Sequence, residues 1–232
     1  MKNTPFLSTI YQRLIVSCQA LEDEPLHGAD IMARMAEAAK VGGAKAIRCN
    51  SVIDARAIKK QTNLPIIAII KQDYSDSDVY ITPTLKEVKE LLTVNPEVIA
   101  LDATNRFRPH GEELSELVHY IHENSDTLIM GDIATLEDAA YAVKCGVDIL
   151  SSTLSGYTMQ TEHKQGPDFE LIRKLSHTYN LPVIAEGKIN RPEDARKMLD
   201  LGAWSVVVGS AITRPQLITK SFVNVIEDKE LK

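Results

Sequence analysis

Short apolar runs alternate along the chain with longer segments in which apolar and polar positions recur at helical spacing. Continuous apolar runs between helices are typical of strands covered on both faces, as in parallel sheets. Eight such runs are predicted to be strands: Leu14–Gln19, Lys45–Arg48, Ile66–Lys71, Val98–Asp102, Leu128–Asp132, Asp148–Thr153, Val183–Glu186 and Ser205–Val208. Eight amphipathic segments, one after each strand, are predicted to be helices: Ala29–Val41, Ser51–Gln61, Thr84–Leu92, Gly111–Asn124, Thr135–Cys145, Asp168–Tyr179, Arg191–Leu201 and Pro215–Ile226.

The junctions between these elements support the count. Gly42, Gly146 and Gly202 stand where a helix should end and the next strand begin, and Thr135 is a typical helix N-cap. Eight strand–helix units in a chain of 232 residues predict an α/β fold, the (β/α)₈ TIM barrel, as a single domain over residues 1–232. The alternative is an open doubly wound sheet, which is disfavoured because no glycine-rich fingerprint follows the first strand.

Composition narrows the class of protein. A hydrophobic content of 44% is enough for a sizeable core, and a formal net charge of −6 argues against nucleic-acid binding. Cys18, Cys49 and Cys145 are too few and too scattered for a disulfide framework, and no Cys/His cluster suggests zinc. Met1–Ile10 has no signal-peptide pattern and no apolar run reaches the length of a membrane span, so we expect a cytoplasmic protein without membrane contact.

Chemistry in a barrel is expected at the C-terminal ends of the strands. A single polar residue at a strand end usually only meets solvent, but the barrel brings all eight ends to one rim. The predicted strand ends carry mostly polar or charged residues: Gln19, Arg48, Lys71, Asp102, Asp132, Thr153, Glu186 and Gly209-Ser210.

Lys71 and Glu186 are the candidates for proton transfer. Lys71 can act as a base only when neutral, which burial and a nearby cation such as Arg48 would favour by lowering its pKa. Glu186 is a candidate second acid/base or a partner for a substrate hydroxyl; the alternative is a plain ion pair between the two residues. Asp132 is a candidate for orienting substrate or lysine, whereas Asp102 is expected to cap the following helix.

A phosphate site is predicted after the last two strands. Gly187-Lys188 and Gly209-Ser210 follow strands seven and eight, the usual phosphate-binding position in this fold. Glycine lets the backbone approach an anion closely, and Arg214 could hold the anion with two hydrogen bonds. Arg106 and Arg108 are expected to be surface charges.

Two strand-to-helix loops are unusually long, Gln72–Pro83 and Leu154–Pro167. Both should lie on the rim that carries the site, where long loops often act as lids. Tyr157 of the second loop, together with Gln19 and Thr153 at strand ends, is predicted to contact the substrate.

Nine motifs, distributed in order over almost every strand end, carry a specific resemblance to a known family. They are Ile15–Ala20, Glu24–His27, Ala46–Arg48, Pro65–Lys71, Tyr80–Thr84, Ile99–Thr104, Thr153–Thr158, Glu186–Ile189 and Val208–Pro215. Together they resemble N-acetylmannosamine-6-phosphate 2-epimerase over nearly the whole chain. Lys188 stands where many relatives have arginine, and Ser210 where many have glycine; both keep an anion site plausible.

The resemblance implies a (β/α)₈ barrel that interconverts N-acetylmannosamine 6-phosphate and N-acetylglucosamine 6-phosphate, a step in bacterial sialic acid breakdown. It implies that Lys71 and Glu186 are the catalytic pair, that Arg48 and Arg214 bind the substrate, and that Asp132 is the family's strand-five aspartate. It also implies a homodimer that needs no metal or cofactor.

Epimerisation at C2 requires removal of a proton next to a carbonyl, so the sugar must react as its open-chain aldehyde. Lys71 would take the proton, and two routes of return remain open at this stage. Either Glu186 supplies the proton on the opposite face, or Lys71 acts with a substrate group while Glu186 assists ring opening. The competing functions are another phosphosugar epimerase or isomerase barrel and a catalytically silent phosphosugar-binding barrel.

Overall fold

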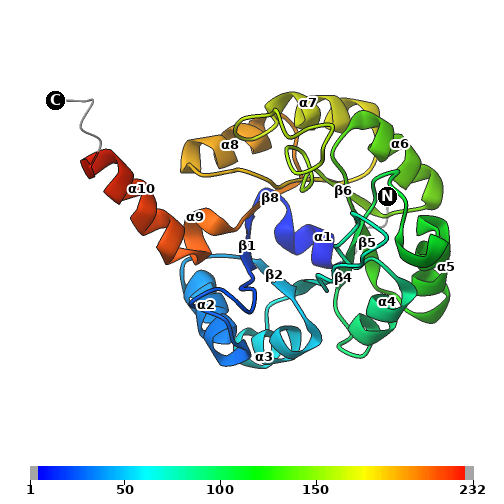
Figure 1. The fold of residues 1–232 in the computed structure, drawn as a ribbon, viewed down its shortest axis with the longest axis horizontal. Helices are drawn as coiled ribbons and strands as arrows, with labels where there is room; N and C mark the ends of the chain where they lie inside the picture. The colour runs from blue at the N-terminus through cyan, green and yellow to red at the C-terminus, as the bar shows by residue number, and fades with distance from the viewer. Residues whose placement is uncertain (1–4, 228–232) are drawn as a thin grey trace.

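The computed structural model describes residues 5–227, in which eight parallel strands form a closed barrel (Figure 1). Each strand pairs with its neighbours in the chain, and β1 pairs with β8 to close the ring. The predicted TIM barrel is therefore confirmed. The strands are β1 (Leu14–Cys18), β2 (Ala46–Asn50), β3 (Ile66–Ile69), β4 (Val98–Asp102), β5 (Leu128–Asp132), β6 (Ile149–Ser151), β7 (Val183–Ala185) and β8 (Ser205–Val208).

Helices surround the barrel, and each of the eight predicted helices is present with ends within a few residues. They are α2 (Ala29–Val41), α3 (Val52–Thr62), α4 (Leu85–Leu92), α5 (Leu114–Asn124), α6 (Leu136–Cys145), α7 (Phe169–Thr178), α8 (Pro192–Asp200) and α10 (Pro215–Glu227). Three short elements were not predicted: α1 (Pro5–Ile10), the 3₁₀ turn η1 (Pro109–Gly111) and α9 (Ser210–Thr213). None of the helices among residues 5–227 is long and apolar enough to cross a membrane.

Some predicted boundaries differ from the observed ones for local reasons. Helix α5 begins at Leu114 rather than Gly111, because His110 and Gly111 have φ angles of 59° and 74°, which a right-handed helix does not allow. The strand ladders of β3 and β7 stop before Lys71 and Glu186, so these two residues lie in the first turns of the loops. The extreme ends of the predicted 1–232 domain, residues 1–4 and 228–232, lie outside the described residues.

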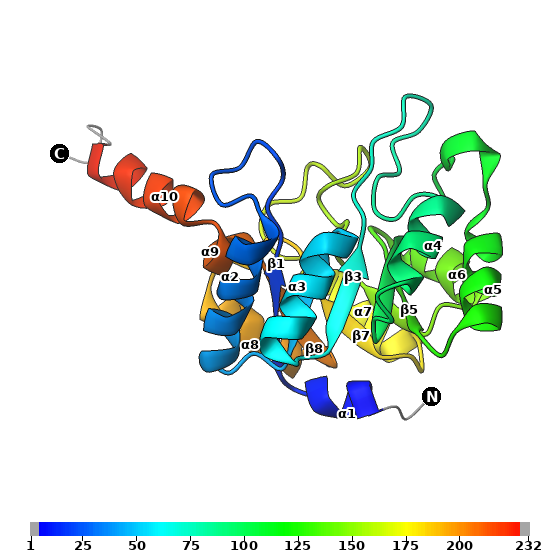
Figure 2. The same ribbon diagram turned by 90° about the horizontal axis from the view of Figure 1, so that it is seen from below.

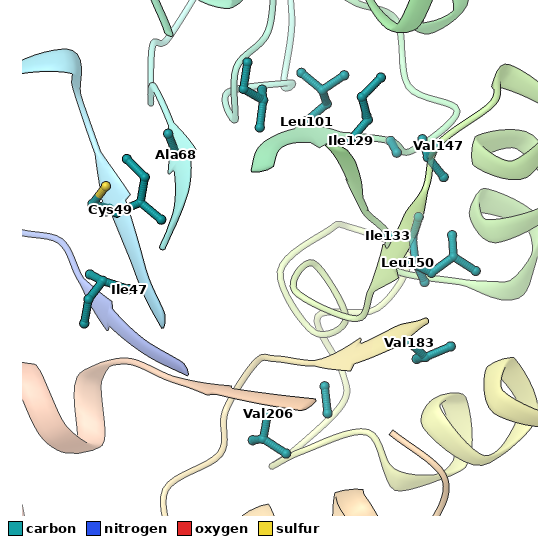
Figure 3. Close-up of a cluster of buried hydrophobic side chains, with 14 of the residues drawn as sticks. Ile47, Cys49, Ala68, Leu101, Ile129, Ile133, Val147, Leu150, Val183 and Val206 are labelled. Atoms are coloured by element: carbon teal, nitrogen blue, oxygen red, sulfur yellow. The ribbon is translucent and has the colours of Figure 1, made fainter. Parts of the chain in front are cut away.

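The core has two apolar layers. One lies between strands and helices, and Figure 3 shows Leu150 and Val183 of that layer pointing outward from the barrel. The other fills the barrel interior and continues into α1, which lies across the N-terminal end of the barrel (Figure 2). The indole Nε1 of Trp204 donates to the carbonyl of Leu7 at 2.9 Å and fixes α1 in place. Among residues 5–227, α1 thus covers the N-terminal end of the barrel, and the cavity described below opens at the other end.

Arg108 is not a surface charge, so the prediction is wrong for this residue, whereas Arg106 is partly exposed at 24% and pairs with Asp102. Arg108 is 4% exposed, and its guanidinium donates to the carbonyls of Thr82, Pro83 and Asp102. Burial lowers the pKa of Arg108 somewhat, but three carbonyl acceptors satisfy its donors. Arg108 therefore connects the end of the long loop between β3 and α4 to the end of β4 through hydrogen bonds.

Asp102 does not cap a helix, which corrects a second expectation. Its carboxylate accepts hydrogen bonds from the backbone N–H and hydroxyl of Thr104, at 3.0 and 2.7 Å, and from Arg106 at 2.6 Å. The next helix begins only at Leu114. Asp102 instead stabilises the loop that leaves β4.

Candidate active site

A cavity of about 270 Å³ opens at the C-terminal end of the barrel. The predicted site residues, with the exception of Asp132, all line it. The lining residues are Ser17, Gln19, Arg48, Ile69, Lys71, Tyr80, Ile81, Thr153, Tyr157, Glu186, Gly187, Lys188, Ile189, Asn190, Val207, Gly209, Ser210, Thr213 and Arg214. The fold therefore brings together candidates from strands β1, β2, β3, β6, β7 and β8 and the loops that follow them.

A buried arginine organises the floor of the cavity. Arg48 is 1% exposed and forms a two-pronged ion pair with Asp132, whose Oδ1 lies 3.1 Å from Nη1. Its Nη1 also lies 2.8 Å from Oε2 of Glu186. The hydroxyl of Thr153 joins the two carboxylates, at 2.7 Å from Asp132 and 3.2 Å from Glu186. Asp132 is completely buried and does not line the cavity, and its carboxylate holds the guanidinium of Arg48.

The cluster sets the charges of its members. Burial pulls the pKa of Arg48 down, but the carboxylates of Asp132 and Glu186 outweigh it and raise the pKa above its ordinary value, so the guanidinium stays charged. Burial raises the pKa of Glu186, and Arg48 only partly opposes this. Nε of Arg48 is buried and has no hydrogen-bond partner within residues 5–227. An unpaired buried donor costs about 1–3 kcal/mol, which a ligand oxygen can recover.

Lys71 meets the conditions for a neutral amine. Its backbone N–H donates to Oδ1 of Asn50 at 2.8 Å, which fixes the start of the loop after β3. Burial, followed by the charges of Arg48 and Arg214, lowers the pKa of Lys71 to about 8, against an opposing effect of Glu186. No hydrogen bond or ion pair holds its ammonium group within the described part of the chain. With a pKa of about 8, roughly a tenth of the Lys71 amine is neutral at pH 7 and able to accept a proton, far more than for an ordinary lysine.

The turn after β7 requires glycine and directs Lys188 toward a loop. Gly187 has a φ of 108°, and a β-carbon there would lie 3.3 Å from the carbonyl oxygen of Thr153. The ammonium of Lys188 donates to the carbonyl of Lys164 at 2.7 Å and lies 5.3 Å from the ring centre of Tyr157. Lys188, predicted to bind phosphate, thus lines the cavity while its charge contacts the loop between β6 and α7.

Arg214 lines the cavity and is held by hydrogen bonds to Glu24 and Ser210. Its Nε lies 2.6 Å from Oε2 of Glu24, and its Nη1 donates to the hydroxyl of Ser210 at 3.0 Å. Gly209 precedes α9 and packs against Ser17, whose β-carbon is 3.4 Å from where a β-carbon of Gly209 would lie. All the residues predicted for the phosphate thus line the cavity: Gly187, Lys188, Gly209, Ser210 and Arg214.

Two polar residues that line the cavity, Ser17 and Tyr80, were not among the predicted site residues. Ser17 lies two positions before Gln19, and its hydroxyl accepts a hydrogen bond from that side chain at 2.9 Å; the two-residue period of a strand could have identified it. Burial, with Asp102 and Asp132, raises the pKa of Tyr80 to about 12, so its hydroxyl is a donor at neutral pH. Tyr80 comes from a long loop, and no strand pattern indicates its orientation.

No group of three or more His, Cys, Asp or Glu side chains placed to hold a metal ion occurs among residues 5–227. The cations facing the cavity are instead side chains of the protein itself, Arg48, Lys71, Lys188 and Arg214.

Comparison with known proteins agrees with this geometry. The family model described as "Putative N-acetylmannosamine-6-phosphate epimerase" matches residues 32–228. The chain is 58% identical over 221 residues to a "Putative N-acetylmannosamine-6-phosphate 2-epimerase" of Clostridioides difficile, with 95% of this chain and 99% of the relative covered. A Listeria monocytogenes protein of the same description is 51% identical, with 92% of both chains covered.

Solved structures give the same result. The N-acetylmannosamine-6-phosphate 2-epimerase from Clostridium perfringens is similar with a TM-score of 0.93 and 54% identity, over 97% of this chain and 98% of that one. A thiamine phosphate pyrophosphorylase from Pyrococcus furiosus, at 20% identity and a TM-score of 0.59, shares the fold alone. Since the family model matches most of the chain and relatives more than half identical to it cover nearly all of its length, the chain belongs to the N-acetylmannosamine-6-phosphate 2-epimerase family.

Proposed function

We propose that this protein interconverts N-acetylmannosamine 6-phosphate and N-acetylglucosamine 6-phosphate by removing and returning the proton at C2. The observation that carries the proposal is an amine with a lowered pKa, Lys71, in the same cavity as a fixed guanidinium, Arg48. A base and a positive charge at one carbon are what enolate formation requires.

In this mechanism Lys71 takes the C2 proton of the open-chain sugar, and Arg48 stabilises the negative charge that develops on the neighbouring oxygen. Asp132 and Thr153 hold Arg48 in place, so the donor is oriented before the reaction begins. Oε2 of Glu186 is already bonded to Arg48 and Thr153, which favours a supporting role in ring opening over delivery of the second proton. The proton then returns to the opposite face of C2 from a substrate hydroxyl, and the ammonium form of Lys71 gives its proton to that oxygen, which restores the neutral amine.

The phosphate of the substrate would bind at the far end of the cavity. Arg214 supplies charge there, and Gly187 and Gly209 allow close approach of the backbone. Gln19, Lys188 and Ser210 add polar groups around the sugar and its phosphate, and Tyr157 would cover them from its loop. Binding the phosphate away from C2 fixes the reacting carbon relative to Lys71.

The proposal is tested by incubating the protein with N-acetylmannosamine 6-phosphate in D₂O and following the products by ¹H NMR. We expect N-acetylglucosamine 6-phosphate with deuterium at C2. Product without deuterium would rule out exchange with solvent and favour a hydride-type route. Absence of any product would leave a phosphosugar-binding barrel as the better account.

A pH dependence follows from the pKa of Lys71. The group must be neutral to act as a base, and its pKa of about 8 means that lowering the pH converts it to the inactive ammonium form. We expect kcat/KM to fall about tenfold per pH unit below roughly pH 8 and to level off above it. An acidic limb centred near pH 10 would contradict the assignment, because it would describe an unperturbed lysine.

We further propose that the protein is a homodimer in the cytoplasm and that α10 contributes to the contact. Figures 1 and 2 both show α10 extending away from the barrel, and this helix has no buried residue within the chain. Phe222 and Ile226 are 66% and 76% exposed. An exposed apolar helix face of this kind is typically covered in an oligomer, and a second copy is the simplest partner.

The dimer is tested by light scattering after size-exclusion chromatography. We expect twice the chain mass for the wild type and loss of the dimer for Phe222→Asp combined with Ile226→Asp. Asn224→Asp, which adds a charge to an exposed polar position of the same helix, should keep the dimer. A wild-type protein with the mass of one chain would contradict the proposal.

A further inference from the structure

Glu24 forms an ion pair that joins the two ends of the barrel sequence. Its carboxylate accepts hydrogen bonds from Nε and Nη2 of Arg214, a residue 190 positions later in the chain. The two side chains are 15% and 25% exposed, so solvent screens them only in part. Glu24 belongs to the loop between β1 and α2 and does not line the cavity, whereas Arg214 does.

The pair fixes the direction of the guanidinium. Glu24 holds the Nε and Nη2 side of Arg214, and Ser210 accepts from Nη1 at 3.0 Å on the other side. The carboxylate is itself held, because Gln216 donates to Oε2 at 3.1 Å and the backbone N–H of Leu21 donates to Oε1 at 3.3 Å. A planar guanidinium held on both sides keeps its remaining N–H donors at fixed positions, which favours bidentate recognition of an anion.

The same carboxylate affects the charge balance of the cavity. Burial raises the pKa of Glu24, but the hydrogen bond and charge of Arg214 outweigh it and lower the pKa below its ordinary value, so Glu24 is ionised at neutral pH. Arg214 lowers the pKa of Lys71, while Glu24 raises it. Glu24 therefore cancels part of the positive potential that Arg214 and Arg48 exert on the amine.

We propose that Glu24 is a positioning residue that orients Arg214 toward the substrate phosphate and moderates the positive charge around the cavity. The inference rests on the proposed function, since it takes Arg214 as the phosphate contact and Lys71 as the base. It assigns two separable effects to one side chain. The geometry of the carboxylate affects binding of the phosphosugar through Arg214, and its charge shifts the pH range in which the amine of Lys71 is neutral.

Three variants separate the two effects, all assayed with N-acetylmannosamine 6-phosphate. Glu24→Gln keeps the size but removes the charge, so the acidic limb of kcat/KM should move to lower pH by roughly 0.5–1 unit. Glu24→Ala also frees Arg214, so KM should rise roughly tenfold, with a smaller change in kcat. Glu24→Asp restores the charge on a shorter side chain, so the limb should return toward its wild-type position while KM remains raised.

Glu22→Gln is the matched control, because it removes the same charge from an exposed position in the same loop. It should leave both KM and the acidic limb unchanged. If the wild type is active but the acidic limb of kcat/KM for Glu24→Gln coincides with that of the wild type, the inference is overturned and the proposed function stands. An inactive wild type would instead refute the proposed function, and the inference with it. Glu24→Gln and Glu24→Asp keep a hydrogen-bonding side chain, so they test the inference even if Glu24→Ala does not fold.

Discussion

Replacing Lys71 with alanine should lower the rate of epimerisation by about 10³-fold or more, which is the typical contribution of a positioned base. The incorporation of solvent deuterium at C2 should fall by the same factor, because both processes begin with removal of that proton. Substrate binding should survive, since Arg48 and Arg214 remain in place. The measurement is ¹H NMR in D₂O, with thermal stabilisation by the phosphosugar as the readout of binding.

Lys60→Ala, which removes an exposed lysine from α3, is the matched control and should keep full activity. Turnover of Lys71→Ala close to that of the wild type would eliminate Lys71 as the base.

Glu186→Gln then distinguishes the two routes of proton return. If Glu186 delivers the second proton, this variant should still exchange the C2 proton of the substrate but form little epimer. If Glu186 only supports Arg48 and ring opening, exchange and epimerisation should fall together.

Asp132→Asn should destabilise the protein by about 3–5 kcal/mol, because it leaves the buried guanidinium of Arg48 without its principal counter-charge. The amide nitrogen would also face a guanidinium N–H, donor against donor. Arg48 cannot relieve the strain by releasing a proton at any ordinary pH. The expected decrease in Tm is roughly 10 °C for a chain of this size, measured by thermal unfolding monitored by circular dichroism.

Two comparisons make this second prediction specific. Asp200→Asn breaks an exposed ion pair, in which the side chains of Arg196 and Asp200 are 70% and 53% exposed. It should therefore change Tm little. The double variant Arg48→Met with Asp132→Leu replaces the buried pair by apolar groups and should be more stable than Asp132→Asn, although inactive. A single variant as stable as the wild type would mean that Glu186 alone compensates Arg48.

Features that depend on neighbouring residues could be predicted from the sequence, whereas contacts between residues far apart in the chain could not. The strands and helices followed from periodicity because burial on both faces of a strand, and on one face of a helix, acts on neighbouring residues. The ends of the strands were predictable to within one or two residues, and the barrel then placed Lys71 and Glu186 at one rim. The missed helices α1 and α9 are too short to show a periodic pattern.

Side-chain partners were not predictable in the same way. Arg108 appeared to be a surface charge because all three of its acceptors are backbone carbonyls, two of them in a loop about 25 residues earlier, and carbonyls carry no sequence signal. Asp132 appeared to be a substrate contact, yet it lies below the cavity and holds Arg48. In both cases the direction of a side chain depends on packing and hydrogen bonds that no local pattern encodes.

The sequence by itself determined the barrel and the set of chemical groups at its C-terminal rim, because the alternation of apolar and amphipathic segments decides which residues end each strand. Only the tertiary structure decided how those groups are paired. Arg48 meets partners 84 and 138 positions away, and Arg214 meets Glu24 at 190. Such pairs form because closure of the barrel brings distant strand ends together, where the exclusion of water strengthens the interaction of their charges.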